Sequence, residues 1–344
     1  MLSSISSSNT ARSERAPRWR WTTTWILALI VVIAIVGTAE THWRDLGYQP
    51  NIRDSAELWS IQRDRVYATK KIPLVLLGAS RIEFGVDMKA LKALLPRYQP
   101  VMLAQNAHYP LATLRDLAAD ERFHGVVLCD IESGGLYKMY TDMQQPLVDY
   151  YHRQWSPSWH AHRLLLNRWQ AHFDVANPQL GIVATALRWI NAEPPPQRDY
   201  FRFYADRSGD IDYTQTDPAA AKHHFEQLAA SGQARALVAP DAWFAGLQEV
   251  YDWTKKIQAR GGNVIFYQSP TAGAVRDVDT FAHPHSLYWD RFAKNSPAAV
   301  LDAADDPRLS AFSLPDDSHL DFRDKPAYTQ ALVDALVARG LVER

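Results

Sequence analysis

The sequence has one cysteine among its 344 residues and almost no net charge. A single cysteine, Cys129, excludes any disulfide bond within the chain. The 37 Lys and Arg residues are matched by 38 Asp and Glu residues, which leaves a net charge of −1. Proteins that bind nucleic acids carry clustered positive charge, so the composition argues against a nucleic-acid partner. Cys129 ends the apolar run 126–129, which predicts a buried structural thiol.

The chain also lacks a pattern of metal ligands. Its 12 histidines include two close pairs, His223 with His224 and His283 with His285. Neither pair has a third ligand at a spacing that zinc sites use. The sequence therefore predicts no metal site, and no motif in it points to a cofactor.

A long apolar stretch stands near the N-terminus. Residues 25–36 carry no charge, and with their flanks they approach the length of ~17–25 residues that a membrane helix needs. Glu40 follows the stretch, and four basic residues precede it (Arg12, Arg15, Arg18 and Arg20). Positive charge marks the cytoplasmic side of a membrane helix. We interpret 21–43 as a transmembrane signal anchor with a cytoplasmic disordered tail over 1–20, and expect the C-terminal domain outside the cytoplasm, in the periplasm of a Gram-negative cell.

Two other interpretations of this stretch stay open. The small residues Gly37 and Ala39 flank Thr38 in the pattern of a signal-peptide cleavage site, and a buried helix of a soluble protein is the third possibility. Trp residues near both ends favour the anchor, because they are enriched where helices cross the membrane surface (Trp21, Trp25 and Trp43).

Alternating strand and helix patterns follow and predict an α/β fold with a parallel sheet of about five strands. The strands are expected at 72–77, 100–104, 125–131, 263–268 and 311–314. The helices are expected at 87–95, 111–119, 240–260 and 325–339.

Two segments stand outside this alternation. Residues 44–70 are expected to form a membrane-proximal helix or linker, so that the main domain covers 71–344. An aromatic insertion over 136–240 carries helices at 157–173 and 178–191 and a loop over 198–213, and we interpret it as a cap on the carboxyl edge of the sheet. Its Trp and Tyr residues either stack on sugars or serve as core, membrane or partner contacts.

The end of the first strand carries the most informative residues. Gly78 breaks the apolar run, and Ser80 follows at the sheet edge where open α/β folds bind ligands. A serine nucleophile needs a base, and the base needs an orienting group. Asp316 and His319 have a spacing that places both side chains on one side of a turn, although Asp317 competes with Asp316 as the orienting group. Taken alone, Ser80 is better explained as a serine that caps the following helix, and only the matching Asp-x-x-His motif favours the nucleophile.

This pairing of motifs resembles the SGNH (GDSL-like) hydrolase superfamily. The motifs are Leu-Leu-Gly-Ala-Ser-Arg at 76–81, Phe-Gly-Val-Asp at 84–87 and Asp-Asp-Ser-His at 316–319. They look most like the membrane-anchored SGNH-like proteins that work beside membrane-bound O-acyltransferases, and the resemblance covers 71–135 and 240–340. It departs from the family pattern at Ala79, where an aspartate is usual, and in having no clear Gly-x-Asn-Asp block.

The resemblance implies an SGNH-like fold and a catalytic triad of Ser80, His319 and Asp316. It also places a second oxyanion donor in the loop after the second strand, where Asn106 or Ala107 would supply it. The alternative is that Asn106 only closes a turn.

Three charged residues near the expected site have more than one interpretation. Arg81 is expected to form an ion pair with Glu83 or Asp87, and the alternatives are that it binds an anionic substrate or stabilises the active-site loop. Asp130 and Glu132 either line the site or only end the third strand.

The expected function is that of an extracytoplasmic serine esterase or O-acyltransferase that modifies a cell-surface polysaccharide. The resemblance implies a carbohydrate or acyl-ester substrate and a membrane-bound O-acyltransferase as partner, and the anchor implies contact with membrane lipid. The second candidate is a non-catalytic SGNH-like accessory subunit of a polysaccharide modification or assembly complex. A lipase or thioesterase ranks third, because the polar loop expected over 198–213 does not suggest an apolar groove.

Overall fold

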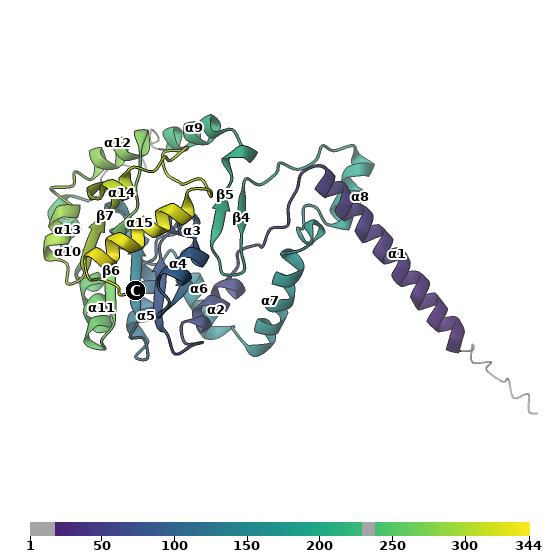
Figure 1. Cartoon of the computed structure of the whole chain (residues 1–344), viewed down its shortest axis with the longest axis horizontal. Coiled ribbons are helices and arrows are strands. Elements are labelled where there is room, and N and C mark those ends of the chain that lie inside the picture. The colour runs from purple at the N-terminus through teal and green to yellow at the C-terminus, as the bar shows by residue number, and fades with distance from the viewer. Residues whose placement is uncertain (1–17, 229–237) are drawn as a thin grey trace, which may run out of the picture. The chain divides into compact units, whose positions relative to one another are not determined.

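The structure is a computed structural model that describes residues 18–228 and 238–344 (Figure 1). The chain divides into two compact units. The smaller unit consists of Met1–Pro50 and Phe173–Pro196, and the larger unit consists of Asn51–His172 and Gln197–Arg344. Most of the tail expected over 1–20 lies outside the described residues.

The larger unit is built on a five-stranded parallel sheet, as expected from the sequence. The strands are β1 (Ile72–Leu77), β2 (Tyr98–Met102), β3 (Val126–Asp130), β6 (Asn263–Gln268) and β7 (Ala299–Asp302), in the spatial order β2-β1-β3-β6-β7. All four neighbouring pairs are parallel. In chain order this is a 2-1-3-4-5 sheet, so the winding direction reverses between β1 and β3. Ligands of such sheets bind beyond the carboxyl ends of the strands at that reversal.

The fifth strand lies elsewhere than the sequence suggested. The expected strand over 311–314 is wrong, because this segment forms a turn after a short helix. The edge strand is β7, which pairs with the residues 265–268 of β6. It is only four residues long, so its apolar signal was too short to separate from a loop.

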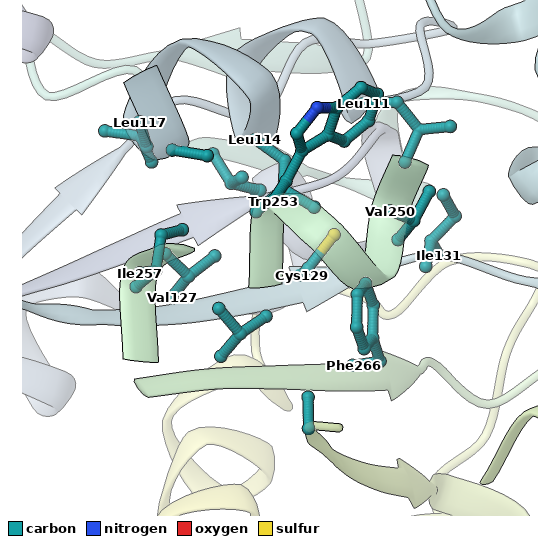
Figure 2. Close-up of a cluster of buried hydrophobic side chains, with 14 of the residues drawn as sticks. Leu111, Leu114, Leu117, Val127, Cys129, Ile131, Val250, Trp253, Ile257 and Phe266 are labelled. Carbon is teal, nitrogen blue, oxygen red and sulfur yellow. The ribbon is translucent and has the colours of Figure 1, made fainter. Parts of the chain in front are cut away.

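Successive side chains of each strand point to opposite faces of the sheet. The strands carry apolar side chains on both faces, and helices cover both. One face is covered by α2 (Ala56–Arg65), α5 (Leu111–Ala119), α11 (Gln248–Ala259) and α13 (Trp289–Asn295). The other face is covered by α4 (Met88–Leu94) and α15 (Lys325–Ala338). Cys129 is fully buried on the first face, as predicted. Figure 2 shows part of that core, in which α5 and α11 meet β3 and β6 (Leu111, Leu114, Leu117, Val250, Trp253, Ile257, Val127, Cys129 and Phe266).

The remaining elements of the larger unit are short or peripheral. The α-helices are α3 (Ser80–Gly85), α6 (Gln145–Arg153), α7 (Pro157–Gln170), α9 (Pro218–Leu228), α10 (Pro240–Ala245), α12 (Gly273–Ala282) and α14 (Pro307–Ser310). The 3₁₀ helices are η1 (Ser133–Leu136), η2 (Lys138–Tyr140), η4 (Tyr213–Gln215) and η6 (Ala303–Asp305). The helix expected over 240–260 is divided into α10 and α11, with Gly246 and Leu247 between them.

The segment 44–70, expected to be a membrane-proximal helix or linker, does contain a helix, α2, which is part of the core. Ser55 caps this helix by accepting a hydrogen bond from the Leu58 backbone. Trp59 is completely buried, and its indole N–H donates to the Leu103 carbonyl at 3.2 Å. The helix therefore belongs to the larger unit rather than forming a spacer.

The described residues of the stretch 136–240 are divided between the two units, so they do not form a single cap on the sheet. Helices α6 and α7 pack against α2, and residues 173–196 belong to the smaller unit. The prediction of a loop over 198–213 is wrong. This segment contains an antiparallel hairpin of β4 (Phe201–Phe203) and β5 (Gly209–Ile211). Its strands have three residues each, too few for a sequence signal. The hairpin packs against Phe84 of α3.

The smaller unit contains α1 (Arg18–Asp45), η3 (Asp174–Ala176) and α8 (Ile182–Asn191). The part of α1 over Trp21–Asp45 has a mean hydropathy of 2.2 in its most apolar window and is long enough to cross a membrane. Almost all of that window is exposed, which is unlike the buried core helix of a soluble protein.

We expect Leu114→Ala to lower the free energy of unfolding of the larger unit by roughly 2–5 kcal/mol, because it empties a closely packed position. Leu114 is completely buried between α5 and the sheet. Urea unfolding of the detergent-solubilised protein, followed by tryptophan fluorescence, measures the change. Lys255→Ala on the exposed side of α11 is the control, and an equally small effect of both substitutions would contradict this packing.

Candidate active site

The turn after β1 depends on a glycine. Gly78 has a φ of +150°, and a Cβ atom there would lie 2.7 Å from the Ile82 side chain and 2.9 Å from the carbonyl oxygen of Asp130. Any other residue would therefore clash with both α3 and β3. The tight turn allows α3 to begin at Ser80, directly beyond the carboxyl end of β1.

A second turn, near the C-terminus, is organised by the Asp316 carboxylate. Its Oδ1 accepts the backbone N–H groups of Ser318 at 2.9 Å and His319 at 2.7 Å. Its Oδ2 lies 2.9 Å from Nδ1 of His319. One carboxylate thus shapes the backbone and orients the imidazole ring.

The environment of Asp316 favours its charged form. Burial acts to raise the pKa of this carboxyl, but the hydrogen bonds from His319 and the Ser318 backbone, together with the nearby Tyr213 hydroxyl, outweigh burial and hold the pKa below its usual value. Tyr213 itself has a raised pKa because it is buried and lies beside Asp316. Asp316 is therefore ionised at neutral pH and can accept a hydrogen bond from the Nδ1–H group of His319.

In the structure, the side chains of Ser80, His319 and Asp316 are linked in that order by hydrogen bonds. Nε2 of His319 lies 2.8 Å from the Ser80 hydroxyl oxygen. With the proton on Nδ1 directed at Asp316, Nε2 is left as an acceptor for the hydroxyl proton. Ser80 is partly exposed, whereas His319 is buried. This is the arrangement that activates a serine, and the catalytic roles of the three residues stay predictions.

Asp317 has a different position from Asp316. Its φ is +66°, its carbonyl accepts the Ala272 backbone N–H at 2.9 Å, and its carboxylate lies 3.3 Å from the Lys222 ammonium. Of the two candidate orienting carboxylates, the geometry therefore places Asp316 on the imidazole.

Arg81 joins the two turns. Its Nε donates to the Ser318 hydroxyl at 3.2 Å, and its Nη1 donates to Glu132 at 3.4 Å. The expected pairing with Glu83 or Asp87 is wrong. Residues two positions apart in a helix do not face each other, and Asp87 instead caps α4. Whether Arg81 also binds substrate stays a prediction.

The two carboxylates after β3 have different surroundings. Glu132 is partly exposed and accepts the Tyr109 hydroxyl at 2.6 Å in addition to Arg81. Asp130 is buried and accepts the Ser269 backbone N–H at 3.0 Å. Burial raises the pKa of Asp130 to about 7, although Arg81 opposes the shift. Glu132 therefore reaches the site through Arg81, whereas Asp130 lies below the serine turn.

The candidate oxyanion residues lie in an exposed turn after β2. The Gln105 backbone N–H donates to the Gly78 carbonyl at 3.1 Å, which holds this turn beside the serine loop. Ala107 has a φ of +60°, and the Asn106 carbonyl lies 2.8 Å from Nδ1 of His108. Asn106 thus does close a turn, and donation to an oxyanion by Asn106 or Ala107 stays a prediction.

Sequence reasoning missed three residues that shape the site. Ser318 lies inside the Asp-x-x-His motif, so its place beside the triad could have been found from spacing. Tyr213 and Tyr109 reach Asp316 and Glu132 from distant segments, and no local signal marks them. Across 18–228 and 238–344, no group of three or more His, Cys, Asp or Glu side chains is arranged to hold a metal ion.

The fold and the site together define an α/β protein with a Ser-His-Asp row at the carboxyl edge of its parallel sheet. Comparison with known proteins adds no closer classification, because no family model matches the chain and no curated protein is similar to it in sequence.

The raised pKa of Asp130 predicts a pH effect on stability. Between pH ~4, the usual pKa of an aspartate, and pH about 7, the folded protein retains a proton that the unfolded chain has lost. The free energy of unfolding should therefore fall as pH rises through this range, by up to roughly 1.4 kcal/mol per pH unit from this group. Above pH about 7, where Asp130 is ionised in the folded protein as well, this group should cause no further loss of stability.

Asp130→Asn isolates this contribution, because asparagine does not titrate. The wild type should lose stability relative to the variant from the lower to the upper end of the range, as measured by urea unfolding at several pH values. A constant difference between the two proteins would show that Asp130 is ionised in the folded state throughout.

Proposed function

We propose that this protein is a membrane-anchored, extracytoplasmic SGNH-like acyl esterase or O-acyltransferase. The observation that carries the proposal is the 2.8 Å contact between the Ser80 hydroxyl and His319, with Asp316 on the opposite ring nitrogen. The position of the serine after the first strand and of Asp-x-x-His near the C-terminus supports the SGNH assignment, as does the parallel sheet.

The proposed chemistry is acyl transfer through a serine ester. Ser80 Oγ attacks the acyl carbonyl carbon while His319 Nε2 takes the hydroxyl proton, and Asp316 stabilises the resulting imidazolium. The tetrahedral intermediate collapses when its C–O bond to the leaving alcohol breaks and His319 returns the proton to that oxygen. Water or a sugar hydroxyl then attacks the acyl-serine ester in the same way and releases Ser80.

The proposed substrate and partner follow from the sequence resemblance. SGNH-like proteins of this type work beside membrane-bound O-acyltransferases, so a cell-surface carbohydrate that gains or loses an acyl group is the substrate class. The long, apolar and exposed helix α1 supports attachment to the same membrane. Basic residues before this helix favour a cytoplasmic N-terminus and an extracytoplasmic catalytic domain.

A serine-reactive fluorophosphonate should label the wild-type protein and should not label Ser80→Ala, because the labelled oxygen is absent. His319→Ala should label slowly, since the hydroxyl loses its base. Labelling is measured by in-gel fluorescence, with circular dichroism to show that each variant is folded. Failure to label a folded wild type, together with unchanged polysaccharide acylation in cells that carry Ser80→Ala, would favour the non-catalytic accessory subunit.

The neighbouring aspartates provide a matched pair of variants. Asp316→Asn should lower the rate of acyl-ester hydrolysis by on the order of 10⁴-fold, because the imidazole loses its orienting carboxylate. Asp317→Asn should have little effect, since asparagine tolerates a positive φ and the carboxylate of Asp317 pairs with Lys222. Equal effects of the two substitutions on release of a chromogenic acyl ester would contradict the assignment of Asp316.

A reporter fused after Arg344 tests the topology. Alkaline phosphatase at this position should be active, and a cytoplasmic-only reporter should be inactive, because the basic flank is expected to stay in the cytoplasm. Recovery of an intact N-terminal peptide from the membrane fraction would exclude a cleaved signal. The opposite reporter pattern would overturn the proposed topology without affecting the proposed chemistry.

A further inference from the structure

Helix α8 has the reverse of the polarity expected of a helix in a soluble protein. The buried residue of α8 is a polar one, Thr185, which is 2% exposed. Its exposed positions are apolar, with Val183 and Ile190 74% and 78% exposed and Leu187 54% exposed. A helix at the surface of a soluble domain directs its apolar stripe inward. The outward apolar face of α8 therefore requires an apolar neighbour.

Thr185 is the inward contact of α8 and fixes which face is exposed. Its hydroxyl donates to the Leu180 carbonyl at 3.0 Å and accepts the Trp43 indole N–H at 3.0 Å. The same indole N–H also reaches the Leu180 carbonyl at 2.9 Å. Trp43 is 2% exposed, so α8 is attached to α1 through a buried polar contact and cannot rotate its apolar face inward without breaking it.

These contacts place α8 beside the end of the apolar stretch of α1, within one compact unit of the chain (Figure 1). The Glu40 carboxylate accepts the backbone N–H groups of Asp174 and Val175, both at 3.1 Å. The ring of Trp189 meets that of His42 edge-on, with centroids 5.4 Å apart. Arg44 also lies 3.7 Å from the Asp174 carboxylate. These contacts come from residues 40–44 of α1, which directly follow the exposed apolar part of the helix.

We propose that α8 lies in the membrane surface where α1 leaves the bilayer, with its apolar face in contact with lipid acyl chains. The inference rests on the anchoring role proposed for α1, and it adds a second lipid-binding element from a segment more than 130 positions later in the chain. Lipid is the favoured occupant because α8 contacts α1 at residues 42 and 43, directly after the exposed apolar part of the candidate membrane span. Amphipathic helices at interfaces bury such a face about 5–10 Å into the headgroup and acyl-chain boundary.

The polar groups of α8 are compatible with this position. Arg188 is the only charged residue of the helix, and its guanidinium donates to the Pro194 carbonyl at 3.0 Å. Trp189 is 59% exposed, and tryptophan is enriched at membrane surfaces. Because the exposed face carries no basic cluster, binding should not require anionic lipid, and phosphatidylcholine vesicles suffice to test it.

The test uses the full chain reconstituted in phosphatidylcholine vesicles and labelled with an environment-sensitive fluorophore at single introduced cysteines. Native Cys129 is buried, and burial raises the pKa of its thiol, so it should not react. Val183→Cys and Ile190→Cys report on α8. Leu29→Cys reports on the span of α1, and Lys255→Cys reports on an exposed position of the larger unit.

Each labelled protein is exposed to iodide in the water and to nitroxide groups attached near the headgroup end or the methyl end of the lipid chains. We expect the labels on α8 to lose most of their emission to the nitroxide near the headgroups and little to iodide. The label at 29 should respond to the deeper nitroxide, and the label at 255 to iodide alone.

The other outcomes separate this inference from the proposed anchor. Iodide quenching of both α8 labels, with lipid quenching at position 29, would overturn the inference and leave the anchor intact. Labels on α8 that respond to neither quencher would show that protein covers the face, either from this chain or from a second copy, and would also overturn it. Absence of lipid quenching at position 29 would refute the anchor itself.

Discussion

The site depends on the absence of a side chain at residue 78. Gly78 approaches the Asp130 carbonyl so closely that no Cβ atom fits between β1 and β3. This contact lets the chain turn within two residues and begin α3 at Ser80. The Gly78 carbonyl in turn accepts hydrogen bonds from the Gln105 backbone at 3.1 Å and the Gln144 amide at 3.2 Å. Loops from three parts of the chain are therefore held at the same edge of the sheet.

The geometry of the triad is maintained by backbone groups as much as by side chains. Asp316 accepts two backbone N–H groups from its own turn, so the carboxylate cannot rotate away from His319 without unfolding that turn. Arg81 connects the turn to the helix that carries the serine by way of Ser318. Such preorganisation reduces the rearrangement that a reaction requires, and it explains why a site assembled from the two ends of the domain can keep one arrangement.

The smaller unit uses the opposite distribution of polarity from the larger one. In the larger unit, apolar side chains are buried on both faces of the sheet. In the smaller unit, the indole N–H of Trp43 and the Thr185 hydroxyl form a buried hydrogen bond, while long apolar runs of α1 and the apolar face of α8 are exposed. This inversion is expected where the surrounding medium is lipid, because lipid solvates apolar groups but not polar ones.

The sequence by itself determined the strands β1, β3 and β6, since each is an uninterrupted apolar run, and the apolar character of α1. It also determined the candidate triad, because Ser80 stands at a strand end and Asp316 and His319 have the spacing of one turn. It did not reveal β7 or the β4-β5 hairpin, whose strands are too short to carry a period.

Only the tertiary structure decided the contacts between distant segments. The pairing of Asp317 with Lys222, the pairing of Arg81 with Glu132, and the approach of Tyr213 to Asp316 all depend on how the chain returns to the sheet edge. The outward apolar face of α8 was decided in the same way, because its orientation is fixed by Trp43, a residue far away in sequence. Local patterns encode periodicity and turns, whereas these choices depend on which groups meet in space.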